Sequence, residues 1–457
     1  MTQETESLLR SAPPVRGAMD PSTVALHEAV DENIRRSGRG YLRPEGESVA
    51  VDLLGSARML KWQERKSAAT FLGSFCWSEL PQVYGRYGGE SARDLVARVR
   101  ALEEASAAVV TDSGMSAAAL LLDSLLEPGD HAIVARSLYN KSKAYLAWLE
   151  KRMGIEVTLL SDVEWEAALE HVTERTRIVL VEIFTNPLMR AFDPEKLAAA
   201  AHEGRKRSPR LRLVVDDTIV TPWGVHTPLL AQGADFVIAS GTKALDGRDR
   251  NLWGYVAANR IDELNACMDL LAMRGGILDE VRCRSVLSGL DGARRNFEDR
   301  CRGASEVARF LAGHAAVSEV FHPSLPDHPD RETVDRCFSQ PGSLVSFRLS
   351  GADDEAARHF CDVLAMTGLV RYALSFDGLV SKVNHHRTVS EYFTAEAEVE
   401  RLGVDRLVRF AMGIEAPADV IASLDWALRS YGRISDEEVA AWRRDRARSL
   451  GLTEEEE

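Results

Sequence analysis

Two segments place reactive side chains directly after short apolar stretches. The first stretch ends in Asp216, Asp217 and Thr218, and the second, residues 234–239, leads into S-G-T-K at residues 240–243. If the two stretches are neighbouring strands of a parallel sheet, a carboxylate, hydroxyls and an amine meet at one sheet edge. An amine of this kind acts as a nucleophile or base when its pKa is lowered. Either segment alone is equally compatible with an ordinary charged surface loop.

A third segment, S-G-M at residues 113–115, precedes an apolar stretch that we expect to be helical. Small residues at a helix N-terminus leave backbone N–H groups open to an anion such as a phosphate. Together the three segments indicate a site that holds an anionic group beside an amine and a carboxylate.

The elements that must position these segments alternate between strands and helices. Apolar runs of strand length alternate with amphipathic stretches of about 10–15 residues, a pattern typical of βαβ units. We therefore expect an α/β fold with a mostly parallel sheet, flanking helices, and chemistry at the carboxyl ends of the strands. The expected strands are residues 131–136, 155–160, 177–184, 211–217 and 234–240, and the expected helices are residues 91–105, 113–126, 139–153, 163–172 and 194–203.

Three parts are expected along the chain. Residues 1–85, which prolines and glycines interrupt, form an N-terminal arm or subdomain, and residues 86–265 form the α/β domain. Residues 266–457 form a smaller C-terminal α+β domain that ends in an acidic tail. Its expected elements are a helical zone that includes residues 261–273 and 294–313, and strands at residues 343–351 and 370–376.

Composition and charge exclude several classes of protein. The 457 residues carry a formal net charge of −14, which argues against binding to nucleic acid. The six cysteines lie far apart without a CxxC pair, so we expect free thiols in a reducing compartment and no metal site. The chain has no leader-like start and no run of about 18 apolar residues, which predicts a cytoplasmic protein without a membrane segment.

Seven short pieces of the sequence occur in the order found in one enzyme family. They resemble the pyridoxal-phosphate (PLP) enzymes of cysteine and methionine metabolism, the trans-sulfuration family that includes cystathionine γ-synthase, cystathionine γ-lyase and methionine γ-lyase. The resemblance runs from about residue 84 to about residue 428 and implies PLP fold-type I, which is aspartate-aminotransferase-like. The pieces are Y-G-R at residues 84–86, S-G-M at 113–115, Tyr139, N-P at 186–187, V-V-D-D-T at 214–218, S-G-T-K at 240–243 and V-R-F-A-M-G-I-E at 408–415.

The resemblance implies roles around the cofactor ring. Lys243 would hold the cofactor aldehyde as an imine and move protons, and Asp216 would keep the pyridine nitrogen protonated so that the ring accepts electrons. Tyr139 would stack on the ring and transfer protons, and Asn186 would lie beside the phenolic oxygen. For these two residues, a core aromatic residue and a turn residue before proline are the simpler alternatives. Asp217 stands where the family usually has Asn.

The cofactor phosphate would bind at the start of the helix that follows S-G-M. In the resemblance, the backbone amides of Gly114 and Met115 and the hydroxyls of Ser240 and Thr242 hold this phosphate. This arrangement combines a helix N-terminus with two hydroxyl donors from the segment that carries the lysine.

Other residues would complete the site from a neighbouring subunit and from the substrate side. In the family the tyrosine and arginine of Y-x-R reach the phosphate of the next subunit, so Tyr84 and Arg86 imply at least a homodimer, and a homotetramer is expected as in relatives. Arg409 would clamp the substrate α-carboxylate through its bidentate guanidinium. Ser375, which matches the serine of the family's S-L-G segment, and the preceding Leu374 would lie near the substrate.

Several motifs depart from the family pattern, so the chain is a divergent member. The N-P-T that usually follows Y-x-R is missing, residues 244–249 read A-L-D-G-R-D, and the family's E-S-L reads V-S-K at residues 380–382. Cystathionine-processing relatives carry charged groups where this chain has Val83, Ala144 and Leu374. An apolar pocket would leave a second amino-acid head unpaired, at about 1–3 kcal/mol per buried polar group, which disfavours cystathionine. Lys141 adds a polar group without an assigned role.

The reaction implied is γ-elimination or γ-replacement on a small L-amino acid with a leaving group at Cγ. The substrate would be methionine-like, O-acylhomoserine-like or γ-halogenated, and a chlorinated allylic substrate would give an alkynyl amino acid. Lys243 would remove the Cα proton, and Tyr139 would protonate the leaving group. The alternatives are β-elimination by a C–S lyase, transamination, cystathionine γ-synthase or γ-lyase proper, and a noncatalytic PLP-binding protein. The leaving group, the acceptor and the pathway stay open.

Overall fold

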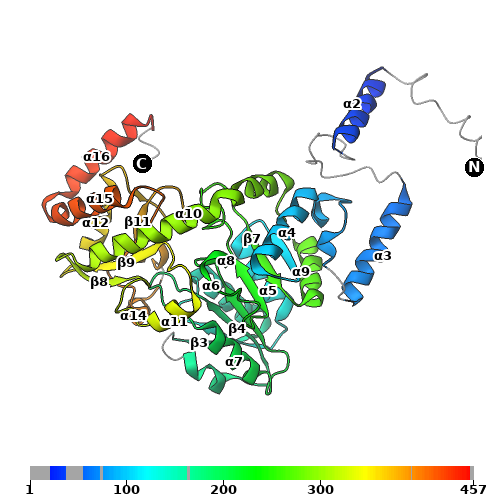
Figure 1. Cartoon of the computed structure of the whole chain (residues 1–457), viewed down its shortest axis with the longest axis horizontal. Coiled ribbons are helices and arrows are strands. Elements are labelled where there is room, and N and C mark those ends of the chain that lie inside the picture. The colour runs from blue at the N-terminus through cyan, green and yellow to red at the C-terminus, as the bar shows by residue number, and fades with distance from the viewer. Residues whose placement is uncertain (1–20, 38–54, 73–75, 162–164, 393, 453–457) are drawn as a thin grey trace, which may run out of the picture.

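Two sheets organise the chain into a large and a small domain (Figure 1). The computed structural model describes residues 21–37, 55–72, 76–161, 165–392 and 394–452. Parts of the predicted N-terminal arm and the end of the acidic tail lie outside the described residues.

The large sheet has seven strands in the order β1-β7-β6-β5-β4-β2-β3. Strands β2 to β6 run parallel, whereas β7 is antiparallel to both of its neighbours, so the predicted mostly parallel sheet is confirmed. The strands β1 and β7 are additional to the prediction. Both are short, rich in small residues and buried, so neither shows the alternation that marks a strand in a sequence. The strands are β1 (Ala107–Thr111), β2 (His131–Ala135), β3 (Glu156–Leu160), β4 (Thr176–Glu182), β5 (Arg212–Asp216), β6 (Phe236–Ala239) and β7 (Gly254–Ala258).

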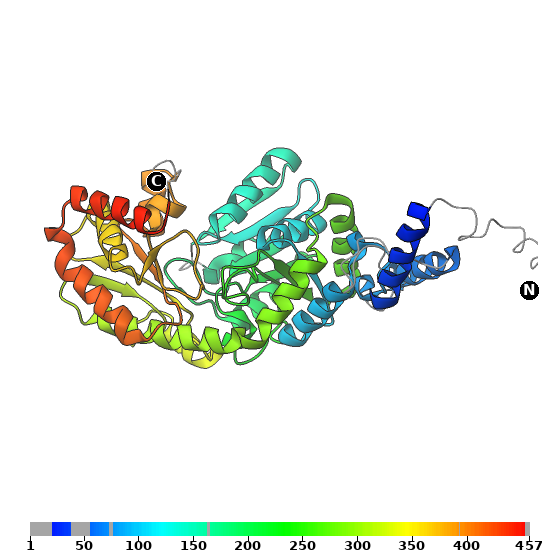
Figure 2. The same ribbon diagram turned by 90° about the horizontal axis from the view of Figure 1, so that it is seen from above.

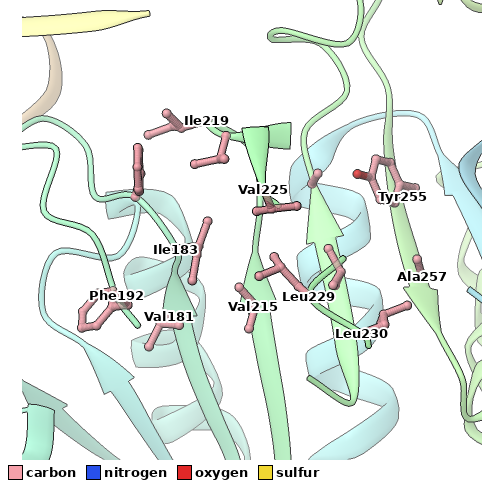
Figure 3. Packing of buried hydrophobic residues seen from close by; sticks show 14 of the residues in the cluster. Val181, Ile183, Phe192, Val215, Ile219, Val225, Leu229, Leu230, Tyr255 and Ala257 are labelled. Carbon is pink, nitrogen blue, oxygen red and sulfur yellow. The ribbon is translucent and has the colours of Figure 1, made fainter. Parts of the chain in front are cut away.

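Successive strand residues point into two separate cores, one on each face of this sheet. Figure 3 shows one face, where Val215 of β5 and Ala257 of β7 lie among Val181, Leu229 and Leu230. One core includes residues of α4 and α7, and the other includes residues of α5, α6 and α9. Helices on both faces bury the sheet and leave its carboxyl edge for the site. The helices are α4 (Glu90–Glu103), α5 (Gly114–Leu125), α6 (Asn140–Met153), α7 (Pro194–Gly204) and α9 (Ile261–Arg274).

The α-helix predicted over residues 163–172 is instead a 3-10 helix, η4 (Trp165–His171). Leu169 and Val172, three residues apart, both contact the core, which fits a repeat of three residues per turn. The predicted domain boundary between residues 265 and 266 falls inside α9, which packs against β1 and β7.

The small domain is built on a five-stranded sheet in the order β10-β11-β12-β9-β8. The edge strand β10 is only two residues long, shorter than the predicted strand 370–376, because residues 374–376 leave the sheet and line a cavity. The strands are β8 (Val317–Phe321), β9 (Leu344–Leu349), β10 (Arg371–Tyr372), β11 (Lys382–His385) and β12 (Val408–Ala411).

A single long helix, α10 (Glu280–Ala312), connects the two domains. It begins well before the predicted helix at residue 294, with Asp279 as its N-cap, which accepts a hydrogen bond from the backbone N–H of Arg282. One part of α10 packs against α4 and another packs against β8 and β9 (Figure 2). The remaining elements are α2 (Pro21–Ser37), α3 (Ser56–Leu72), η2 (Trp77–Glu79), η3 (Gly85–Tyr87), α8 (Thr221–Gly224), α11 (Arg331–Cys337), α12 (Asp354–Ala365), α13 (His386–Ser390), α14 (Glu396–Leu402), α15 (Pro417–Ser430), η5 (Tyr431–Arg433) and α16 (Asp436–Ser449).

The N-terminal helices α2 and α3 lie at the end of the molecule opposite α16 (Figure 2). Helix α3 is tied to α9 through Lys66, whose amine lies 2.5 Å from the carboxylate of Asp269. All six cysteines are buried and free. In the part of the chain that the structure describes, no helix is long and apolar enough to cross a membrane.

Gly254 offers a test of the packing that supports the site. A Cβ at this position would lie 2.6 Å from Gly114 Cα, so the antiparallel strand β7 can pass the start of α5 only without a side chain. We expect Gly254→Ala to lower the free energy of unfolding by about 2 kcal/mol, as overpacking does. Gly289→Ala is the matched control in α10, where a Cβ meets nothing within 4 Å, and it should raise stability by up to about 1 kcal/mol. Thermal denaturation measures both, and equal melting temperatures would contradict the packing argument.

Candidate active site

A cavity of about 1000 Å³ lies at the carboxyl ends of β2, β4, β5 and β6, between them and residues of the small domain. Such an edge is where ligands bind in parallel α/β sheets. No group of three or more His, Cys, Asp or Glu among the described residues could hold a metal ion. All predicted site residues except Tyr84 and Arg86 line this cavity: Gly114, Met115, Tyr139, Asn186, Asp216, Ser240, Thr242, Lys243, Leu374, Ser375 and Arg409.

Lys243 follows β6 and reaches across to the small domain. Its Nζ donates a hydrogen bond to Ser375 Oγ at 2.8 Å and lies 4.7 Å from the centre of the Phe376 ring. Burial, with a smaller contribution from the positive charge of Arg409, lowers the pKa of Lys243 to about 8. A substantial fraction of the amine is therefore neutral near physiological pH, as a nucleophile or base requires.

Asp216 ends the neighbouring strand β5. Its Oδ1 accepts hydrogen bonds from the backbone N–H and the hydroxyl of Thr218, at 2.9 and 2.5 Å. The Thr218 Oγ1 in turn accepts from the backbone N–H of Ser240 at 2.9 Å, so the two strand ends are locked together. Burial raises the pKa of Asp216 to about 6, against the effect of the Thr218 hydrogen bonds. This carboxyl group can share a proton with a basic nitrogen placed in the cavity.

The start of α5 forms a close cradle beside β6. A Cβ on Gly114 would lie 2.5 Å from Ser240 Cβ, so this position has room for glycine only. The first N–H groups of a helix have no partner inside the helix, and here they belong to residues that line the cavity. The Thr242 hydroxyl bonds both the carbonyl and the N–H of Trp253, at 3.2 and 3.1 Å, which holds the segment beside the cradle. The cradle suits a phosphate group.

Arg409 enters the cavity from β12. Its guanidinium donates to Asn186 Oδ1 at 3.3 Å and to the carbonyl of Leu374 at 2.7 Å. Burial lowers its pKa to about 10. Because these hydrogen bonds go to neutral oxygens, a bound carboxylate would complete the partners of this buried cation.

Tyr139 lies at the start of α6, with 44% of its surface exposed. Its backbone N–H donates to Glu182 Oε1 at 2.7 Å, and burial together with the charge of Glu182 raises the pKa of its phenol. The phenol is therefore protonated at neutral pH and can serve as a proton donor.

Tyr84 and Arg86 do not line the cavity of their own chain. Tyr84 is 42% exposed, and the Arg86 guanidinium lies 5.6 Å from the centre of its ring. Val83 and Ala144, expected to make the pocket apolar, are not among the lining residues either. Leu374 lines the cavity at 72% exposure.

Sequence reasoning missed several residues of the cavity wall. Glu182 pairs in register with Asp216 across β4 and β5, and a glutamate that ends a buried strand is a signal that could have identified it. Phe376, whose ring centre lies 4.7 Å from Lys243 Nζ and 5.7 Å from Arg409 Cζ, and His386 also line the cavity, as does Lys141, to which the sequence assigned no role. The sequence carries no comparable signal for His386, because only the turn into α13 brings it to the wall.

Comparison with known proteins agrees with this geometry. The model of the Cys/Met metabolism PLP-dependent enzyme family matches residues 66–429. The chain belongs to the Cys/Met metabolism PLP-dependent enzyme family. It is 30% identical over 357 residues to an L-methionine gamma-lyase of Fusobacterium nucleatum, covering 78% of this chain and 88% of the relative. It is 33% identical over 386 residues to an O-succinylhomoserine sulfhydrylase of Pseudomonas aeruginosa, covering 83% and 91%. Two crystal structures are also similar to this chain: a cystathione gamma lyase (CalE6) from Micromonospora echinospora and metB from Corynebacterium glutamicum.

 The TM-score is 0.70 for the cystathione gamma lyase and 0.71 for metB. Both are 28% identical to this chain and cover 76% of it, and the match spans 89% and 87% of their own chains, respectively.

This Cys/Met metabolism enzyme therefore depends on pyridoxal 5'-phosphate, the cofactor of its family. The predicted family and the predicted fold are both confirmed. The cavity fits the cofactor, because it combines a buried amine of lowered pKa, a carboxyl group at the next strand end, and a glycine cradle at a helix start. Family membership makes the protein a lyase or transferase of cysteine and methionine metabolism.

A cluster of buried carboxyl groups lies beneath Asp216. Asp217 is fully buried, and neither of its carboxyl oxygens has a hydrogen-bond partner among the described residues. The Tyr255 hydroxyl donates to Glu103 at 2.5 Å. Burial, with added repulsion from Glu103 and Asp216, raises the pKa of Asp217 well above its ordinary value, and burial raises that of Glu103 to about 7. The folded enzyme therefore binds protons here that the unfolded chain releases.

The sign of the resulting pH dependence follows from these raised pKa values. A carboxyl group with a raised pKa in the folded state costs no stability below its unfolded pKa, and its cost grows as the pH rises through the folded value. We expect Asp217→Asn to raise the free energy of unfolding by about 1–3 kcal/mol at pH 8, because folding then no longer requires a carboxylate that is ionised in the unfolded chain to take up a proton. The gain should shrink as the pH falls towards 4.

Denaturation of the cofactor-free protein between pH 4 and pH 8 measures this effect. Asp291→Asn is the matched control, because this carboxylate is 76% exposed, and the difference it makes should not grow with pH. A gain for Asp217→Asn that is the same at both ends of the range would contradict a buried, protonated carboxyl group.

Proposed function

We propose that this Cys/Met metabolism enzyme catalyses γ-elimination or γ-replacement on a small L-amino acid, with Lys243 as the catalytic base. The proposal rests on one observation: the Lys243 amine, with its pKa lowered to about 8, faces the same cavity as Asp216 and Arg409. The names of two relatives refer to methionine and O-succinylhomoserine. Both amino acids carry a substituent on Cγ, which supports a leaving group at that carbon.

The chemistry supplied by bound PLP is an electron-accepting pyridine ring. In this proposal Asp216 holds a proton at the ring nitrogen. The first amides of α5, at Gly114 and Met115, and the Ser240 hydroxyl bind the phosphate group. Thr242 contributes through its hydroxyl, which its hydrogen bonds to Trp253 keep in place.

The substrate binds on the side of the small domain. Arg409 binds the α-carboxylate, and Asn186 holds the guanidinium through their 3.3 Å hydrogen bond. Lys243 takes the Cα proton, and Ser375, 2.8 Å from its Nζ, keeps the amine aimed into the cavity. Tyr139 gives a proton to the group that leaves Cγ. Leu374 lies on the substrate side, at the cavity wall.

We also propose that the complete site needs a second subunit. The cavity of about 1000 Å³ is larger than a small amino acid and its cofactor require, which leaves room for side chains from a neighbour. Tyr84 and Arg86 lie outside the cavity of their own chain and are the proposed contribution of the partner. The active unit is then a homodimer, and two dimers form a homotetramer.

The first test removes the catalytic amine. We expect the purified protein with PLP to absorb visible light and to release a 2-oxo acid from L-methionine, O-succinyl-L-homoserine or a γ-chlorinated amino acid. Lys243→Ala should lose this absorbance and about 10²–10⁴-fold or more of the rate, because it removes the base. Lys206→Ala, a change in an exposed lysine, is the control and should behave as wild type.

The products decide between the proposed reaction and its alternatives. A 2-oxo acid with four or more carbons indicates γ-elimination, whereas pyruvate indicates β-elimination by a C–S lyase. Turnover of cystathionine in preference to the other substrates would assign the enzyme to cystathionine γ-synthase or γ-lyase. A protein that stays colourless after incubation with PLP, or one that binds PLP and converts no amino acid, would contradict the proposal.

The second test addresses the shared site. We expect Arg86→Ala and Lys243→Ala to be nearly inactive alone but to regain about a quarter of the wild-type activity when the two chains are co-expressed. Half of random pairs are mixed, and each mixed pair holds one intact site of its two. Co-expression of Lys243→Ala with Asp216→Ala is the control. Both residues lie in the same cavity, so neither site of a mixed pair is intact, and no activity should return. No recovery with Arg86→Ala would contradict a contribution across subunits.

A further inference from the structure

Two buried cations join the segment that follows Lys243 to the segment that carries Ser375. The Arg300 guanidinium, from α10, donates to the carbonyls of Ala244 at 3.3 Å and of Gly247 and Gly378 at 3.4 Å each. These contacts connect residues 244–249 to residues 375–382. Lys243 and Ser375 stand at the starts of these two segments. The connection between the segments therefore limits how far the Lys243 amine can move from the Ser375 hydroxyl.

A second connection between the same segments is the ion pair of Lys382 and Asp249. The Lys382 Nζ lies 2.6 and 2.5 Å from the two carboxylate oxygens of Asp249. The Lys382 side chain is 7% exposed and that of Asp249 is 39% exposed, so the pair is partly shielded from water. A shielded ion pair of good geometry is worth more than an exposed one, and breaking it leaves an uncompensated charge.

The backbone packs closely against this ion pair at Gly378. A Cβ on Gly378 would lie 2.1 Å from Asp249 Oδ2 and 2.7 Å from Lys382 Nζ, so the ion pair rests directly on the glycine. Asp249 itself has a φ of 54°, in the left-handed region that residues with a side chain seldom adopt. A strained backbone of this kind persists only where surrounding contacts hold it. The ion pair with Lys382 is one contact that can hold it.

Each of the two buried cations has an acidic partner near Lys243: Asp377 for Arg300 and Asp249 for Lys382. Asp377 lies 3.7 Å from Arg300 Nε and accepts a hydrogen bond from Ser343. Among the charged groups near the Lys243 amine, Arg409 and Lys382 lower its pKa, whereas Asp377 and Asp249 raise it. Lys382 and Asp249 therefore act on the pKa of Lys243 in opposite directions, so their effects partly offset each other.

We propose that Lys382 and Asp249 are positioning residues: their ion pair fastens the segment after Lys243 to the segment of Ser375, and so fixes the 2.8 Å contact between Lys243 Nζ and Ser375 Oγ. The two residues belong to the two stretches, 244–249 and 380–382, in which the sequence departs from its family's pattern, and they meet although they are 133 positions apart. The inference rests on the proposed function only in that Lys243 is the catalytic amine.

The test uses Lys382→Met, Asp249→Asn and the double variant that contains both changes. Each single variant should lower kcat about 10-fold to 100-fold with little change in KM, because a small displacement of the reacting amine slows the chemical step. The double variant leaves no unpaired charge, so it should fold, yet its kcat should stay low because the tether is absent. Lys382→Arg keeps the cation and should recover much of the rate. Arg443→Met, which breaks a 2.6 Å ion pair between α16 and α12, is the matched control and should leave kcat unchanged.

A second readout follows the Lys243 amine itself in the cofactor-free protein. The rate at which a small acylating reagent labels Lys243, followed by peptide mass spectrometry across pH, gives the pKa of the amine. We expect a wild-type midpoint of about 8, a higher midpoint for Lys382→Met, a lower one for Asp249→Asn, and a midpoint between those of the two single variants for the double variant. A purely structural role would not move the two single variants in opposite directions.

Three outcomes separate the proposals. A double variant with wild-type kcat would overturn the positioning role. Single variants with wild-type kcat would overturn it as well. If the wild type converts no amino acid while the midpoints shift in opposite directions, the proposed function fails and the coupling of this ion pair to Lys243 stands.

Discussion

Lys243 and Arg409 are both buried at the cavity, and the exclusion of water weakens the charged form of each. The chain compensates Lys243 with a hydroxyl acceptor from Ser375 and Arg409 with neutral oxygens. The carboxyl groups nearby, including Asp216, have raised pKa values for the same reason, since burial disfavours their charge too. The site thus holds fewer charges than its residue types suggest, and a substrate carboxylate at Arg409 would supply an anion to this buried cation.

The proposed site residues are divided between the two domains. Lys243 and Asp216 end strands of the large sheet, whereas Ser375 and Arg409 belong to the small domain. The distance between the amine and its substrate therefore depends on how the two sheets are held, and α10 is the helix that contacts both. Arg300 of this helix bonds carbonyls of both segments, so a residue outside the cavity lining connects the segment after Lys243 to the segment of Ser375.

The local parts of the fold and site could be predicted from the sequence, and the parts that depend on distant contacts could not. The parallel strands and the segments around Asp216 and Lys243 carry their own patterns, because a buried strand followed by polar residues is visible in the sequence. The strands β1 and β7 lack such a pattern, since buried alanines resemble a helix as well as a strand. In the sequence, Lys382 and Asp249 stand only in two stretches that differ from the family's pattern. Their contact is not predictable, because nothing in a sequence marks contacts between residues 133 positions apart.

The argument against cystathionine as a substrate needs different residues from those that the sequence suggested. The apolar pocket expected from Val83 and Ala144 is absent from this chain's cavity, whose wall includes Lys141 and His386. His386 is neutral at physiological pH, because burial and the charge of Arg409 lower its pKa well below the ordinary value. A neutral imidazole gives no ionic partner to a carboxylate, whereas the exposed amine of Lys141 does. For the proposed function, this wall argues for a leaving group with one negative charge, as in a succinyl ester, over cystathionine, whose second head needs partners for both an ammonium and a carboxylate.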